Sequence, residues 1–219
     1  MNKDEKLALE YLKTLGNGIP KFEPEGNCPP DFAFENKLAI EVRRLNQNYF
    51  KGLEVEGIER ATIKIHQLLK NCFNSYSSND KSYFVAIDYR RPITQKTKVL
   101  KKEIKDTLER FLSNPKFFPA KHIVNQNISL RFIEATKKHE NLFRLGINHD
   151  FDSGGWLVGL LVENTSFCIA EKSEKIKKYK SKYHYWWLLL IDHIGLDIDQ
   201  EDFAELKNYS LNRGSLIKL

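Results

Sequence analysis

Apolar and polar residues alternate with a period of two through residues 29–44, a pattern that predicts a β-hairpin. The turn falls at Glu35-Asn36-Lys37, between two short strands. A three-residue loop there pairs Phe34 with Leu38 and Phe32 with Ile40. The apolar positions that this pairing places on one face are Phe32, Phe34, Leu38, Ile40 and Val42. The other face carries small or charged residues.

The same register sets Asp31 opposite Glu41 on the second face of the hairpin. Directly opposed Cβ atoms lie about 4.5–5.5 Å apart, and like charges in that position destabilise a sheet. A cation would explain the pair, since Mg²⁺ is typically held by one or two carboxylates together with water and phosphate oxygens. A one-residue slip would move Glu41 into the core, so the alternation favours the acidic pair. The alternative is a surface hairpin in which Arg43 screens the repulsion.

The rest of the chain alternates between helical and strand periodicities, which predicts an α/β fold with a mixed central sheet flanked by helices. Helices are predicted at about 4–15, 54–72, 95–113, 164–181 and 200–208. Strands are predicted at about 20–22, 82–89, 127–135, 142–148, 156–162 and 185–192. Residues 127–135 and 142–148 are interpreted as a hairpin, and 82–89 as an interior strand with both faces buried.

Composition narrows the class of protein. A chain of 219 residues with 41% hydrophobic and 29% charged residues suits one folded domain over residues 1–219, or one domain with a modest insertion. The net charge of +6 suits a polyanionic partner without requiring one. The lysines of the predicted helix at 95–113 form a solvated face or, alternatively, lie along a nucleic-acid backbone.

The cysteines and the hydropathy exclude other classes. Cys28, Cys72 and Cys168 are far apart in sequence, which argues against a zinc site and a disulfide framework. No stretch approaches the roughly 20 apolar residues of a membrane span, and the chain is predicted to be cytoplasmic, with no membrane partner.

Pro30-Asp31 and Glu41-Val42-Arg43 resemble the two half-motifs of the PD-(D/E)xK nuclease superfamily, which has a restriction-endonuclease-like fold. The direct match covers about residues 29–49. Residues 176–179 and 185–190 also resemble the C-terminal part of uncharacterised bacterial proteins similar to this superfamily. The resemblance implies a core of a helix, a three-stranded meander, a second helix and a further strand. The predicted elements at about 4–90 would form this core, and those at about 95–219 would form an extension.

The resemblance also implies a chemistry, the Mg²⁺-dependent hydrolysis of phosphodiester bonds. Asp31 and Glu41 would hold the Mg²⁺, for which Mn²⁺ can substitute, and the partner would be nucleic acid, with DNA expected before RNA. The position of the motif lysine is occupied by Arg43, which stays protonated and can contact a phosphate but cannot act as a base. Gln47 could orient substrate or water. The alternative is a nuclease-fold module that has lost cleavage and binds nucleic acid or a protein.

A lysine interrupts the apolar stripe of the predicted helix at 164–181. The stripe consists of Thr165, Cys168, Ile169, Ile176 and Tyr179, and Lys172 lies in its middle. Buried lysines are rare unless they are paired. Lys172 is therefore expected either to extend its ammonium group to solvent or to supply the catalytic cation that Arg43 only partly replaces. Lys175 lies one turn along and is a second candidate contact to nucleic acid.

Overall fold

The computed structural model describes residues 1–35, 37–52, 54–115, 120–195, 198–212, 214 and 216. The chain divides into two compact units, one formed by Met1–Gln47 with Gly155–Leu219 and the other by Asn48–Gly154. Within the described residues, five α-helices accompany two four-stranded sheets and one two-stranded sheet. The predicted α/β class is confirmed, although the strands form three sheets rather than one central sheet.

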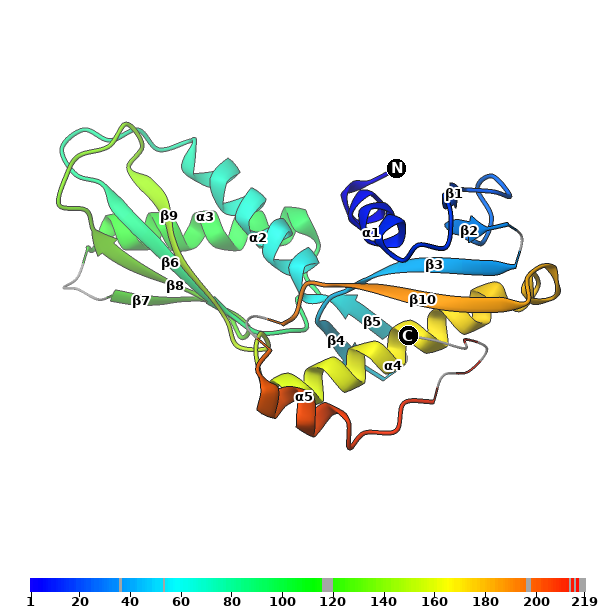
Figure 1. The fold of residues 1–219 in the computed structure, drawn as a ribbon. Coiled ribbons are helices and arrows are strands. Elements are labelled where there is room, and N and C mark those ends of the chain that lie inside the picture. The colour runs from blue at the N-terminus through cyan, green and yellow to red at the C-terminus, as the bar shows by residue number, and fades with distance from the viewer. Residues whose placement is uncertain are drawn as a thin grey trace. The chain divides into compact units, whose positions relative to one another are not determined.

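The first unit is built on a four-stranded sheet in the order β1-β2-β3-β10 (Figure 1). The meander β1 to β3 is antiparallel, whereas β10 runs parallel to β3 along its whole length. The elements of this unit are α1 (Lys3–Thr14), β1 (Lys21–Phe22), β2 (Phe32–Phe34), β3 (Leu38–Leu45), α4 (Leu157–Ile176), the 3₁₀ helix η1 (Lys180–Lys182), β10 (Tyr185–Asp192) and α5 (Gln200–Leu206).

Helices cover both faces of this sheet. Ala8 and Leu12 of α1 pack with Phe32 and Ile40 on one face. On the other face, α4 packs against small side chains of the hairpin, with Cys168 and Ile169 in one cluster with Ala33 and Ala39. The face of the hairpin that carries Glu41 is therefore not a solvent face, as a surface hairpin would require, because the two alanines leave room for α4.

The second unit has its own sheet in the order β7-β8-β6-β9 and a separate two-stranded sheet formed by β4 and β5 (Figure 1). Within the four-stranded sheet, β9 is parallel to β6 and the other pairs are antiparallel. The elements are β4 (Asn48–Lys51), β5 (Glu54–Gly57), α2 (Ile58–Phe73), β6 (Tyr83–Tyr89), α3 (Thr97–Ser113), β7 (Ala120–Asn125), β8 (Ile128–Glu134) and β9 (Phe143–Asp150).

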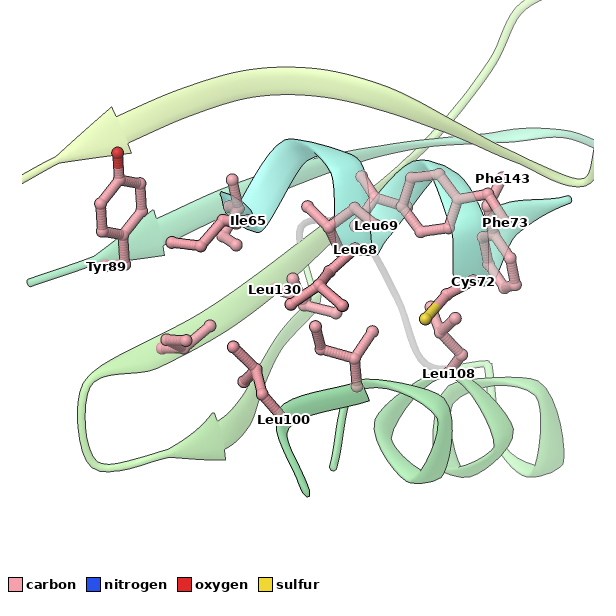
Figure 2. Packing of buried hydrophobic residues seen from close by; sticks show 14 of the residues in the cluster. Ile65, Leu68, Leu69, Cys72, Phe73, Tyr89, Leu100, Leu108, Leu130 and Phe143 are labelled. Carbon is pink, nitrogen blue, oxygen red and sulfur yellow. The ribbon is translucent and has the colours of Figure 1, made fainter. Parts of the chain in front are cut away.

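Both helices of the second unit pack on the same face of its four-stranded sheet. Figure 2 shows Ile65 and Leu69 of α2 and Leu100 and Leu108 of α3 meeting side chains of the sheet such as Leu130. These side chains are almost wholly buried.

One predicted strand and the start of one predicted helix are wrong. The run at 156–162 was predicted as a strand, but it forms the beginning of α4. A short continuous apolar run has no periodicity that separates a buried strand from a buried helix. Conversely, Glu54–Gly57, predicted as the start of a helix, pairs with β4 as a strand, and α2 begins only at Ile58.

The pairing of the strands also differs from prediction. β8 and β9 do not form a hairpin with each other, because β6 lies between them. β8 instead pairs with β7, a strand that was not predicted. β6 itself lies in a different sheet from β2 and β3, so the strand that runs parallel to the hairpin is β10. The predicted division into a core at 4–90 and an extension at 95–219 does not follow the boundaries of the two units.

Candidate active site

The β2–β3 hairpin has the register that the sequence predicts. Phe32 pairs with Ile40 and Phe34 with Leu38, and the apolar face of the hairpin is buried. Glu35 in the connecting loop has a φ of 44°, the left-handed conformation that a three-residue hairpin loop requires. Asn36 of the predicted turn lies outside the described residues.

Asp31 directly precedes β2, so the register continues to place it opposite Glu41. Its Oδ2 accepts a hydrogen bond from the backbone N–H of Val42, with 2.7 Å between the two atoms. This bond fixes the carboxylate of Asp31 beside β3, next to the position of Glu41.

Lys172 of α4 joins the two carboxylates. Its Nζ donates a hydrogen bond to Glu41 Oε2 at 2.6 Å and lies 3.7 Å from Asp31 Oδ2. Only 7% of the Lys172 side chain is exposed. The ammonium group therefore does not extend to solvent, and residues 31, 41 and 172 meet in one cluster despite their distance in sequence.

Glu41 is the most buried member of this cluster. Its side chain has no exposed surface, and Lys172 and Lys175 both donate to its Oε2. Among the described residues, no group forms a hydrogen bond with the other carboxylate oxygen, Oε1, which is also buried. An anionic oxygen in that position favours a cation close to it, because an unpaired buried polar atom is costly.

Lys175 approaches Glu41 from the more exposed side of the cluster. Its Nζ lies 3.2 Å from Glu41 Oε2, and about half of the side chain, 48%, is exposed. Burial alone would lower the pKa of Lys175, but attraction to the Glu41 carboxylate and the hydrogen bond with it raise the pKa overall. Lys175 is therefore held as a cation beside Glu41.

Arg43 lies on the same face of β3 as Glu41, two residues further along. Its Nη2 donates to Glu171 Oε2 at 2.9 Å, so α4 holds this side chain as well. Arg43 Nε is buried and has no hydrogen-bond partner among the described residues. An unsatisfied guanidinium donor suits an anionic ligand such as a phosphate.

A polar pocket of about 270 Å³ lies beside the cluster. Asp31, Arg43 and Lys172 contribute to its wall, as do Glu171 and the beginning of α1, through residues such as Asp4. Both signs of charge thus line a concave surface. Gln47, predicted to orient substrate or water, follows the end of β3, and the described residues that line this pocket do not include it.

Sequence patterns did not predict the other polar and charged groups near this pocket. His193 contacts Arg44 through Nδ1 and Asp4 through Nε2, each at 3.2 Å. This chain of contacts links β3, the segment after β10 and the first turn of α1. Its members are far apart in sequence, and no local pattern predicts that they meet. Glu171 also went unnoticed, because a glutamate on a helix surface is ordinary.

No family model, curated protein or solved structure matches this chain. Among the helices of the described residues, none is long and apolar enough to cross a membrane. In the same part of the chain, no three or more His, Cys, Asp or Glu side chains gather closely enough to hold a metal ion by themselves. A metal at this site would therefore need ligands beyond the Asp31 and Glu41 side chains.

Proposed function

We propose that this protein hydrolyses phosphodiester bonds of nucleic acid with the help of Mg²⁺, through a site that resembles that of the PD-(D/E)xK nucleases. The observation that carries the proposal is the convergence of Asp31, Glu41 and Lys172, with Lys172 Nζ 2.6 Å from one carboxylate and 3.7 Å from the other. Two acidic side chains and a lysine are the residue types that the resemblance requires.

The order of elements in the first unit supports the same class. That unit contains a helix, a three-stranded antiparallel meander, a second helix and a strand parallel to β3, namely α1, β1–β3, α4 and β10. This is the order that the resemblance implies for a restriction-endonuclease-like core. The residues of the second unit, Asn48–Gly154, stand in sequence between the meander and the second helix.

The two carboxylates fit a divalent cation. Asp31 and Glu41 would be its protein ligands, and Glu41 Oε1 has no hydrogen-bond partner among the described residues to compete with it. Mg²⁺ commonly takes one or two carboxylates and completes its coordination with water and phosphate oxygens. When bound, such an ion polarises the phosphate and lowers the pKa of a coordinated water.

The cationic side chains have separate tasks in this proposal. Lys172 keeps the two carboxylates together and donates to an oxygen of the scissile phosphate. Arg43, whose side chain is 31% exposed, contacts the same phosphate with its guanidinium. Lys175, which is more exposed, holds a neighbouring phosphate of the backbone. Gln47 remains a candidate for orienting substrate.

One observation favours a second candidate, a nuclease-fold module that binds nucleic acid or a protein without cleaving. Glu41 is wholly buried and already receives two lysines, an arrangement that a purely structural ion cluster would also show. The two candidates differ in one measurable property. A structural cluster has no need of a divalent ion, whereas the catalytic site does.

The test measures Mn²⁺ binding by calorimetry and the cleavage of plasmid DNA and single-stranded RNA with Mg²⁺. The variants are Glu41→Gln and Lys172→Met, with Glu174→Gln as the matched control, because Glu174 lies on the exposed side of α4. We expect Glu41→Gln to lose both Mn²⁺ binding and cleavage and Lys172→Met to lose cleavage by at least about 100-fold, the scale of removing one stabilising donor. A wild-type chain that neither binds Mn²⁺ nor cleaves supports the binding module instead.

A further inference from the structure

The four-stranded sheet of the second unit has one face that no helix among the described residues of this unit covers. α2 and α3 both pack on the face that includes Val85, Ile87 and Leu130. The register places the paired residues Lys121 and Arg131 together on the opposite face, and Asp88 with His149. Lys121 and His149 are exposed there.

A pocket of about 310 Å³ lies at one end of this uncovered face. Its size is at the lower end of the roughly 300–1,000 Å³ of small-ligand sites. Its wall combines cationic, amide and apolar groups from β6, β7 and the segment after β9. They include Asp88, Arg90, Lys121, Ile123, Gln126 and Phe151.

Phe151 gives this pocket an aromatic wall. The residue is 49% exposed, which is unusual for a phenylalanine. The guanidinium of Arg90 lies over the ring at 5.2 Å from its centroid, and the His149 ring lies 4.3 Å away. Arg90 and His149 thus hold the Phe151 ring in place, while part of the residue stays exposed to a ligand.

The charge around the pocket is positive. Among the described residues of the wall, the acidic one is Asp88, and it is already neutralised, because Arg131 donates to both of its carboxylate oxygens, at 3.0 and 2.7 Å. Arg90 and Lys121 then remain as cations in the wall, and Arg144 extends the positive charge along the same face of the sheet. Cations that flank an exposed aromatic ring are the combination that binds single-stranded nucleic acid, with bases stacked and the backbone held by charge.

We infer that this pocket binds one base of a single-stranded nucleic acid, stacked on Phe151, while Arg90 and Lys121 hold the adjoining phosphates. The inference rests on the proposed function, because it names the class of substrate that a nuclease of this kind would receive. A single strand fits better than a duplex, since the bases of a duplex do not present a free face to the ring.

Binding is measured by fluorescence anisotropy with a labelled 12-nucleotide oligo(dT), and with a 12-base-pair duplex, in EDTA so that no cleavage occurs. We expect Phe151→Ala to weaken the binding of the single strand by roughly 5- to 150-fold, the loss of one stacked base. Phe151→Tyr keeps the ring and should bind as the wild type does. Circular dichroism checks that both variants are folded.

A pair of lysine variants tests the second part of the inference, the contact of Lys121 with a phosphate. Lys121→Gln should lower the slope of log affinity against log salt by about 0.7, the value for one phosphate contact on a single strand. Lys102→Gln removes the same charge from an exposed position of α3, which packs against the other face of this sheet, and should leave the slope unchanged. If Lys102→Gln changes the salt slope and Lys121→Gln does not, the bound oligonucleotide lies along α3. That result would overturn the inference.

Equal affinity of Phe151→Ala and the wild type for oligo(dT) also overturns it, as does a duplex that binds more tightly than the single strand. These results are separate from those of the proposed cleavage. Glu174→Gln, on the exposed side of α4, should bind oligo(dT) as the wild type does. A chain that binds through Phe151 but never cleaves refutes the proposed function alone, and a chain that cleaves without needing Phe151 refutes only this inference.

Discussion

Lys172→Met tests whether the ion cluster of the first unit is as buried as the structure indicates. Lys172 is the residue that contacts both Glu41 and Asp31, and its side chain is only 7% exposed. Methionine retains the apolar stem and leaves the packing of α4 nearly unchanged. The substitution therefore removes a charge and little else.

The expected cost follows from the burial of Glu41. Breaking a buried ion pair by removing one partner typically costs about 3–5 kcal/mol, because the remaining charge stays buried. Lys175 still donates to Glu41 at 3.2 Å, so a loss of roughly 3 kcal/mol, the lower end of that range, is expected. This is a large part of the 5–15 kcal/mol by which proteins of ordinary stability are folded.

Removing both charges should reduce the free energy of unfolding by less than removing Lys172 alone. Apolar residues that replace a buried ion pair at similar volume are often neutral or stabilising. We therefore expect Glu41→Met/Lys172→Met to recover most of the stability that Lys172→Met loses. The double-mutant cycle then gives the coupling between the two side chains.

Tryptophan fluorescence during urea unfolding measures the free energy of unfolding of the unit that contains the cluster. All three tryptophans, Trp156, Trp186 and Trp187, belong to the unit that contains the cluster, so their signal reports the unfolding of that unit. Lys178→Met, at an exposed position just after α4, is the matched control. A loss below about 1 kcal/mol in Lys172→Met would be that of an exposed ion pair and would refute the burial of the cluster.

Two further predictions concern titratable groups. Since the pKa of Lys175 is raised above 10.5 in the folded state, its contribution to stability is fully present below pH 10.5 and is lost as the pH rises through the folded value. Lys175→Met should therefore flatten the fall of the unfolding free energy above pH 10.5, and equal slopes in variant and wild type would contradict the ion pair. Burial raises the pKa of the Cys72 and Cys168 thiols, whereas Cys28 is exposed, so one thiol should react rapidly with an aromatic disulfide reagent in the native protein and three in urea. Rapid reaction of more than one thiol before unfolding would contradict the burial of Cys72 and Cys168.

Local patterns predicted the parts of the fold that local physics controls. The alternation at 29–44 gave the correct register, because a one-residue slip would have buried the wrong face. Lys172 stood out because a lysine in an apolar stripe needs a partner, and the partner proved to be Glu41. In both cases the cost of the alternative arrangement can be judged from the sequence.

Long-range pairing could not be judged in that way. The strand parallel to β3 is β10, which follows it by more than 130 residues, whereas the nearest predicted strand after the second helix was the one at 82–89. The sequence of an interior strand such as β6 does not indicate which sheet the strand joins, since both of its faces carry apolar residues. Sequence order alone therefore favoured the shorter connection, and the second unit was taken for a continuation of the first.

The positively charged side chain beside Asp31 and Glu41 does not have to come from position 43. Glu41 and Arg43 lie on the same face of β3, about 6.6 Å apart along the strand, and α4 contacts each of them with consecutive residues. Glu171 pairs with Arg43, and Lys172 pairs with Glu41. The helix thus brings an ammonium group to the carboxylates from the layer above the sheet, where a lysine at position 43 would have brought it along the strand. An arginine in the hairpin motif is then no argument against catalysis, because what the proposed chemistry requires is a lysine beside Asp31 and Glu41 in space, from whichever element supplies it.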